Sequence, residues 1–208
     1  MEGRRINLEF TTSKAYMDAC SSHYNQERSG DMQDPNIMNE DAHTWEKPPP
    51  GYWAINIDAS FLKDQRGGLA FLVRDVKGSI ITGGTKTVQC NDAEEAEVLA
   101  MVFAIEFASE CNNSKVIFQN DNKYVWETIT SHGSSVHWKL EPIIEDAKKI
   151  VSSKPFWVFK LVKRTANTPC GWIARQVARR LLSPYWMGAI PPDLQLMLVK
   201  DISRDGIG

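Results

Sequence analysis

The sequence predicts an α/β fold built on a mixed five-stranded sheet with helices packed on its faces. Between residues 52 and 88, three apolar segments alternate like strands and follow one another through short turns. Helical and strand-like patterns then alternate along the rest of the chain, which gives the element order βββαβααβα. Consecutive strands with short turns pair antiparallel, and later strands separated by helices complete a mixed sheet.

The elements are expected in the following order. Strands are predicted at residues 52–61, 67–73 and 79–88, and the turn at Asp75–Gly78 makes the last two a hairpin. A helix then runs to about Glu110, with Asn91 as its N-cap and Glu94 in the position of a capping box. The remaining elements are a strand at 115–120, helices at 121–130 and 136–152, a strand at 156–162 and a helix at 168–182 that Asn167 would cap.

The composition divides the chain into three parts. Residues 1–48 include a polar stretch poor in aliphatic side chains, so we expect a disordered lead with a short helix over residues 13–28. The run Pro48-Pro49-Pro50-Gly51 ends this lead, and a single domain is expected over residues 49–183. In the tail over residues 184–208, the amphipathic segment 194–199 is expected to dock either on that domain or on a partner.

Bulk composition limits the possible classes of protein. With 208 residues, 42% of them apolar, the chain can form the core of one domain. Its net charge of -2 does not mark a nucleic-acid binder, but residues 147–192 contain nine Lys or Arg and no Asp or Glu. Such a block is either a solvated surface or a phosphate-binding one. Four scattered cysteines, no signal peptide and no membrane-length apolar run predict reduced thiols in an intracellular protein, nuclear or cytoplasmic, that does not enter a membrane.

Three acidic residues stand where apolar ones would be expected. Asp58 lies inside an alternating strand, where an ionised carboxylate is costly without a partner. Glu97 falls in a helical stripe of small apolar residues that should pack on the sheet. Asp121 follows a strand at its carboxyl end, which is where α/β folds place ligand groups.

Each of these acids also has a plainer explanation. Asp58 could lie on the wet face of an edge strand, Glu97 could reach water at the edge of its stripe, and Asp121 could be a helix N-cap. If the three meet, however, they could not all stay ionised without a cation. Their oxygen ligands favour Mg²⁺ (or Mn²⁺), so Asp58, Glu97 and Asp121 are predicted as metal ligands and catalytic residues for phosphodiester hydrolysis.

Five stretches of sequence carry these and other polar residues in a fixed order: Trp45 to Ser60 with Asp58, Gly68 to Gly78, Ala96-Glu97-Val-Leu-Ala100, Phe118-Gln-Asn-Asp121-Asn122, and Arg164-x-x-Asn167. Together they resemble the type 1 ribonuclease H family, specifically its reverse-transcriptase-like branch common in plants. The resemblance covers about residues 45–182. It implies a ribonuclease H-like fold, a retroelement origin, catalysis by the three acids with Mg²⁺ or Mn²⁺, and an RNA/DNA hybrid as ligand.

The chain departs from the family pattern at the last helix. There the family has Asn-x-x-Ala-Asp, whose Asp is a fourth acid that helps to hold the ion activating water, and this chain has Asn167-Thr-Pro-Cys170-Gly171. Gly171 therefore replaces the fourth acid, and no His lies just before the helix. Ala59 and Asn122 replace the usual Gly and Ser as milder changes. We therefore expect hydrolysis to be weak or absent.

The resemblance also implies how nucleic acid would be bound, through phosphates and 2′-hydroxyl groups. The expected contacts are Ser60, Asn122, Arg164, Arg175 and Arg179 of a monomeric protein, although Arg164 could instead anchor its loop. Two functions stay open. One is a metal-dependent endonuclease that cuts the RNA strand of RNA/DNA hybrids, which the three retained acids favour. The other is a non-catalytic nucleic-acid-binding or protein-interaction module derived from a retroelement, which Gly171 favours.

Overall fold

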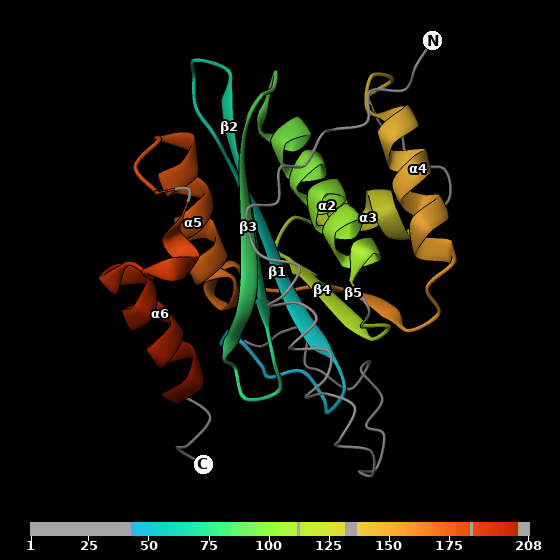
Figure 1. The fold of residues 1–208 in the computed structure, drawn as a ribbon. Coiled ribbons are helices and arrows are strands. Elements are labelled where there is room, and N and C mark those ends of the chain that lie inside the picture. Colours follow the sequence, from blue (N-terminus) through green and yellow to red (C-terminus); the bar gives the residue numbers. More distant parts are fainter. Residues whose placement is uncertain (1–42, 112, 132–136, 184, 204–208) are drawn as a thin grey trace.

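The structure is a computed structural model that describes residues 43–111, 113–131, 137–183 and 185–203. The helix expected over residues 13–28, like most of the expected N-terminal lead, lies outside the described residues. Five strands form one sheet in the order β3-β2-β1-β4-β5 (Figure 1). The β1–β2 and β2–β3 pairs are antiparallel, whereas β1–β4 and β4–β5 are parallel. The predicted mixed five-stranded sheet is confirmed.

The strands lie within two residues of their expected positions: β1 Trp53–Phe61, β2 Arg66–Arg74, β3 Ile80–Gln89, β4 Val116–Asn120 and β5 Trp157–Leu161. The turn before β3 is closed by a hydrogen bond from the Gly78 N–H to the Asp75 carbonyl at 2.9 Å. Gly78 has φ +83°, a left-handed conformation that glycine adopts at little cost. The short turns make β1, β2 and β3 a meander, as the sequence predicts.

Helices cover both faces of the sheet (Figure 1). On one face, α2 (Ala93–Glu110), α3 (Lys123–Thr130) and α4 (Glu141–Ser152) enclose the larger apolar core. On the other face, α5 (Thr168–Ala178) and α6 (Pro192–Ser203) enclose a smaller core with the even-numbered side chains of β2. A Cβ at Gly68 would lie 2.4 Å from backbone atoms of α5, so glycine at this position allows the helix to approach β2 closely.

Several helix ends differ from the sequence expectations. Helix α2 is capped by Asp92, whose carboxylate accepts from the Glu95 N–H at 2.8 Å, so the predicted caps Asn91 and Glu94 are each off by one residue. Helix α4 begins only at Glu141, because a proline in the first turn favours a helix start there. Helix α5 ends at Ala178 rather than near residue 182, since Arg180 adopts φ +58° and the chain leaves the helix.

Packing extends beyond residues 49–183 on both sides. The Trp45 side chain is buried, and its ring lies 3.4 Å from the Arg74 guanidinium. Leu194 and Leu198 of α6 are buried in the smaller core, and Asp201 of α6 pairs with Arg74 at 2.8 Å. Between the two alternatives for the amphipathic tail segment, the structure therefore shows docking on the same domain.

Two further expectations concern the thiols and membranes. Cys90, Cys111 and Cys170 are free, and Cys20 lies outside the described residues. Within the described ranges, every helix is too short or too polar to span a bilayer.

Candidate active site

The register of the central strands brings two of the predicted acids to the same level of the sheet. Strand β1 pairs in parallel with β4 up to Asn56 opposite Gln119. Continued for two residues, this register places Asp58 level with Asp121, just past the carboxyl end of β4. Strand β1 is central and Asp58 is only 8% exposed, so the alternative of a wet edge strand is wrong.

Glu97 reaches the same region from α2. Its side chain is also only 8% exposed, which excludes the alternative that it extends into water. The Asn120 Nδ2 group lies 3.5 Å from Glu97 Oε2 and donates to the Ile57 carbonyl at 3.1 Å. Asn120 thus connects Glu97 on α2 to Ile57, which precedes Asp58. Asn120 itself precedes Asp121.

Asp121 is not the N-cap of α3, as its plainer explanation required. Asn122 caps that helix, because its side chain accepts from the Val125 N–H at 3.3 Å. The Asp121 carboxylate instead has Oδ2 at 3.0 Å from Arg164 Nε, and its Oδ1 is buried without a hydrogen-bond partner. A buried carboxylate oxygen without a hydrogen-bond partner is unusual. Such an oxygen is expected to bind a water molecule or a cation.

The acids influence one another electrostatically. Burial, and then the charge of Asp121, raises the pKa of Asp58 to about 7 against the lowering effects of the Ala59 N–H, Arg164 and Arg175. Burial, and then the charges of Asp58 and Asp121, raises the pKa of Glu97 to about 9. The three carboxyl groups therefore share one electrostatic site, although they come from β1, α2 and the end of β4. Raised pKa values are typical of carboxyl groups that are buried beside other acids.

Amide side chains fix the backbone beside Asp58. The Asn167 Nδ2 group donates to the Ile57 carbonyl at 2.8 Å, so this carbonyl receives amides from both β4 and the start of α5. Asn167 occupies the N-cap position of α5, but its side chain makes no capping hydrogen bond, and the expected capping role is wrong. Asn56 completes the contact by donating to Asn167 Oδ1 at 3.1 Å.

Gly171 faces the same site, where the family pattern has its fourth acid. A Cβ at this position would lie 2.6 Å from Asp58 Oδ2 and 3.3 Å from Arg175 Nη1. The space that a side chain would need is therefore taken by the Asp58 carboxylate. A larger residue at position 171 would require Asp58 Oδ2 to shift, while Oδ1 of the same carboxylate accepts from the Ala59 N–H at 2.8 Å.

The expected nucleic-acid contacts lie around these acids at different depths. Ser60 is half-buried on β1, on the same face as Asp58, and Asn122 is half-buried at the start of α3. Arg164 is exposed in the turn before α5, Arg175 is exposed on that helix, and Arg179 is exposed at its C-cap. Of the three arginines, Arg164 and Arg175 lie close enough to the acids for their charges to act on Asp58.

Whether a divalent ion fits depends on both ligand type and arrangement. The ligand type fits: carboxylate oxygens are hard donors, and the buried Asp121 Oδ1 has no partner. As arranged, no three His, Cys, Asp or Glu side chains in the described ranges are placed to hold a metal ion. To hold an ion, the three carboxyl groups would have to move closer together and Arg164 would have to release Asp121 Oδ2. Gly171 supplies no ligand for a second ion.

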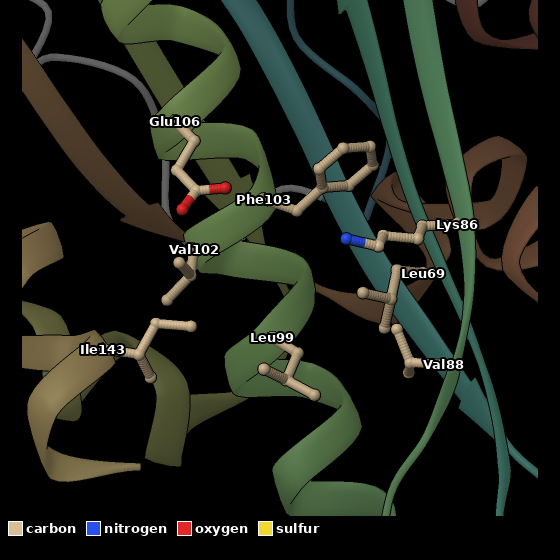
Figure 2. A pocket seen from close by; sticks show the side chains of 8 residues that line it. All are labelled: Leu69, Lys86, Val88, Leu99, Val102, Phe103, Glu106 and Ile143. Carbon is tan, nitrogen blue, oxygen red and sulfur yellow. The ribbon is translucent and has the colours of Figure 1, made fainter. Parts of the chain in front are cut away.

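A small cavity elsewhere in the fold does not belong to this site. It has a volume of about 30 Å³ and lies between α2 and strands β2 and β3 (Figure 2). Six of its eight lining residues are apolar, and the other two are Lys86 and Glu106. This space holds about one water molecule, so it is not a pocket for a substrate.

Comparison with known proteins places the chain in a family. A family model described as reverse transcriptase-like matches residues 56–177, a range that contains Asp58, Glu97, Asp121 and Gly171. The chain belongs to the reverse transcriptase-like family. Its domain is ribonuclease H-like, as the five sequence stretches predict. No curated protein matches the chain.

Solved structures confirm the ribonuclease H-like fold. RNase H1 from the halophilic archaeon Halobacterium salinarum has a TM-score of 0.57 at 16% identity, over 62% of this chain and 98% of that one. LC11-RNase H1, isolated from compost by a metagenomic approach, has a TM-score of 0.58 at 16% identity, over 64% and 99%. A foamy viral protease-reverse transcriptase in complex with an RNA/DNA hybrid has a TM-score of 0.53 at 13% identity, over 74% of this chain and 24% of that one.

The ribonuclease H-like domain also contains site residues that sequence reasoning missed. Asn120 and Asn56 fix the strands that carry Asp58 and Asp121, and both are buried polar residues in otherwise apolar strands. A polar residue within a strand pattern could have indicated their role, because a buried amide in a central strand needs a hydrogen-bond partner. Trp45 and Asp201 lie outside the family match, and no sequence pattern links either of them to Arg74.

Proposed function

We propose that this ribonuclease H-like domain binds RNA/DNA hybrids and cleaves their RNA strand slowly, using a divalent metal ion. The observation that supports the proposal is a set of three buried carboxyl groups that act on one another electrostatically, one of which keeps an unpartnered oxygen. Two proteins of similar fold, LC11-RNase H1 and the foamy viral enzyme, have been solved in complex with RNA/DNA hybrids. These relatives support a hybrid as the ligand class.

Asp58, Glu97 and Asp121 would hold the ion. When bound, it would acidify a water molecule and stabilise charge on the phosphoryl oxygens. Asn120 orients the Glu97 carboxyl, and Asn167 fixes the Ile57 carbonyl beside Asp58. Arg175 and Arg164 place positive charge at the edge of the site, where the phosphates of a nucleic-acid backbone would lie.

The expected rate is low because Gly171 offers no carboxylate. Loss of one group from a catalytic site typically lowers turnover ~10²–10³-fold. The same position favours a second candidate function, a hybrid-binding module that does not cleave. Asp58 Oδ2 lies where a side chain at position 171 would begin, so a fourth acid has no space there in the present arrangement.

Cleavage of a labelled RNA/DNA hybrid by the purified protein tests both candidates. With Mg²⁺ or Mn²⁺ we expect slow cleavage of the RNA strand, which a chelator stops and which Asp58→Asn reduces ~10²-fold or more. Arg66→Gln is the matched control, because it breaks an Arg–Asp pair with Asp64 that is on the surface and takes no part in the site.

Cleavage that persists unchanged in Asp58→Asn would contradict the assignment of the site. Hybrid binding without any cleavage in the wild type would favour the non-catalytic module.

A further inference from the structure

We infer that Arg164 is an exchangeable counter-ion of Asp121, which releases this carboxylate to a divalent cation when a nucleic-acid phosphate draws the guanidinium away. The inference rests on the proposed function, since it describes how the same site is regulated. It predicts that cation and nucleic acid each strengthen the binding of the other through this one side chain.

The two members of the Arg164–Asp121 pair differ greatly in exposure. The Asp121 side chain is 3% exposed, whereas the Arg164 side chain is 88% exposed and reaches in from solvent to bring Nε to 3.0 Å from Oδ2. Oδ1 of the same carboxylate remains buried and unpartnered. The arginine therefore neutralises only one side of a carboxylate that can still accept a second positive ligand.

The Arg164 side chain is exposed to solvent, whereas its backbone is fixed by a hydrogen bond. The guanidinium itself loses little by leaving, because the Arg164 side chain is 88% exposed, but its departure leaves the buried Asp121 carboxylate uncompensated until a cation takes its place. The Arg164 carbonyl, by contrast, accepts from the Asn167 N–H at 3.1 Å in the turn η2 (Arg164–Ala166). The side chain can thus swing outward while its Cα stays beside the site.

A divalent cation and Arg164 compete for the same charge. A cation bound to Asp121 would stand a few Å from the guanidinium, and the two like charges repel each other. A freed guanidinium binds a phosphate well, because its planar donors match the phosphate oxygens. A bound phosphate removes Arg164, which competes with the cation, and a bound cation releases Arg164 to bind phosphate. Thermodynamic linkage then requires that each ligand raise the affinity for the other by the same factor.

Calorimetric titration of the metal-free protein with Mn²⁺, alone and with a short DNA duplex, measures this coupling. The duplex presents phosphodiesters but has no RNA strand to cleave. In the wild type we expect the duplex to raise Mn²⁺ affinity about 5-fold or more. Arg164→Gln should bind Mn²⁺ about 2- to 5-fold more tightly than the wild type when no duplex is present, and should show a much smaller gain with it.

Two controls separate competition from a structural role. Arg164→Lys keeps the positive charge but lacks the planar donors, so it should keep the competition with Mn²⁺ and only part of the gain with the duplex. Arg66→Gln, which breaks a surface Arg–Asp pair elsewhere, should behave like the wild type. Mn²⁺ affinity that is unchanged or lower in Arg164→Gln, or an equal gain with the duplex, would overturn the inference alone. An absence of Mn²⁺ binding in every protein would overturn the proposed function together with it.

Discussion

Replacement of Asp201 by alanine is expected to lower the free energy of unfolding by about 3–5 kcal/mol, because it leaves a buried arginine charge without its carboxylate. Arg74 is fully buried, and its Nη1 lies 2.8 Å from Asp201 Oδ2. Burial lowers the pKa of Arg74 to about 10, and Asp201 acts in the opposite direction. The Arg74 guanidinium also donates to Asn56 Oδ1 at 2.7 Å. Loss of the Asp201 carboxylate would therefore also disturb the amide side chains beside Asp58.

Urea unfolding of the variant and of two controls measures this effect. Arg66→Gln breaks an exposed Arg–Asp pair and should cost less than about 1 kcal/mol. The double variant Arg74→Met with Asp201→Leu removes both charges and should be more stable than Asp201→Ala alone. A loss below about 1 kcal/mol for Asp201→Ala would contradict the buried ion pair and the docking of α6 on the sheet.

Asp58→Asn is expected to stabilise the metal-free protein by roughly 2–4 kcal/mol near neutral pH, at the cost of metal binding. The folded state raises the pKa of Asp58 from 3.8 to about 7 and that of Glu97 from 4.5 to about 9. Between the lower and the upper values, the folded protein holds protons that the unfolded chain has lost. Stability must therefore fall as the pH rises through this window, and below about pH 4 these groups contribute no penalty.

Unfolding of the metal-free wild type at a series of pH values checks this sign. We expect its free energy of unfolding to decline between about pH 5 and pH 8, and the decline to be smaller in Asp58→Asn. Asp64→Asn is the control, because Asp64 is exposed and a hydrogen bond from Arg66 lowers its pKa. A stability that rises with pH across this window in the wild type would show that the carboxyl groups are not mutually repelling in the folded state.

The sheet could be predicted from the sequence because its signals are local. Alternating apolar residues, a glycine turn at Asp75–Gly78 and helical stripes fixed the order of the elements. Helix ends were predicted less well, since neighbouring polar residues such as Asn91 and Asp92 compete for one cap and only packing decides between them. The docking of α6 depends on Arg74 and Asp201, which are 127 positions apart, and no local pattern reveals that contact.

The candidate site was predictable in part, because two of its acids interrupt local apolar patterns. Asp58 and Glu97 stood out as charges in apolar patterns, and the structure buries both. The Arg164–Asp121 pair could not be predicted, because it joins the turn before α5 to the end of β4 and the two residues are 43 positions apart. No local sequence pattern indicates such a contact. The same holds for Asn120, whose Nδ2 group contacts Ile57 of β1 and Glu97 of α2.

Calorimetric titration of the metal-free protein with Mn²⁺ at neutral pH, in the wild type and in Glu97→Gln, tests most directly whether the three acids form a cation site. The predicted result is the binding of one ion by the wild type with release of protons, because a cation lowers the raised pKa values of Asp58 and Glu97. Glu97→Gln should bind much more weakly and release fewer protons. Identical titration curves for the two proteins would contradict the proposed site.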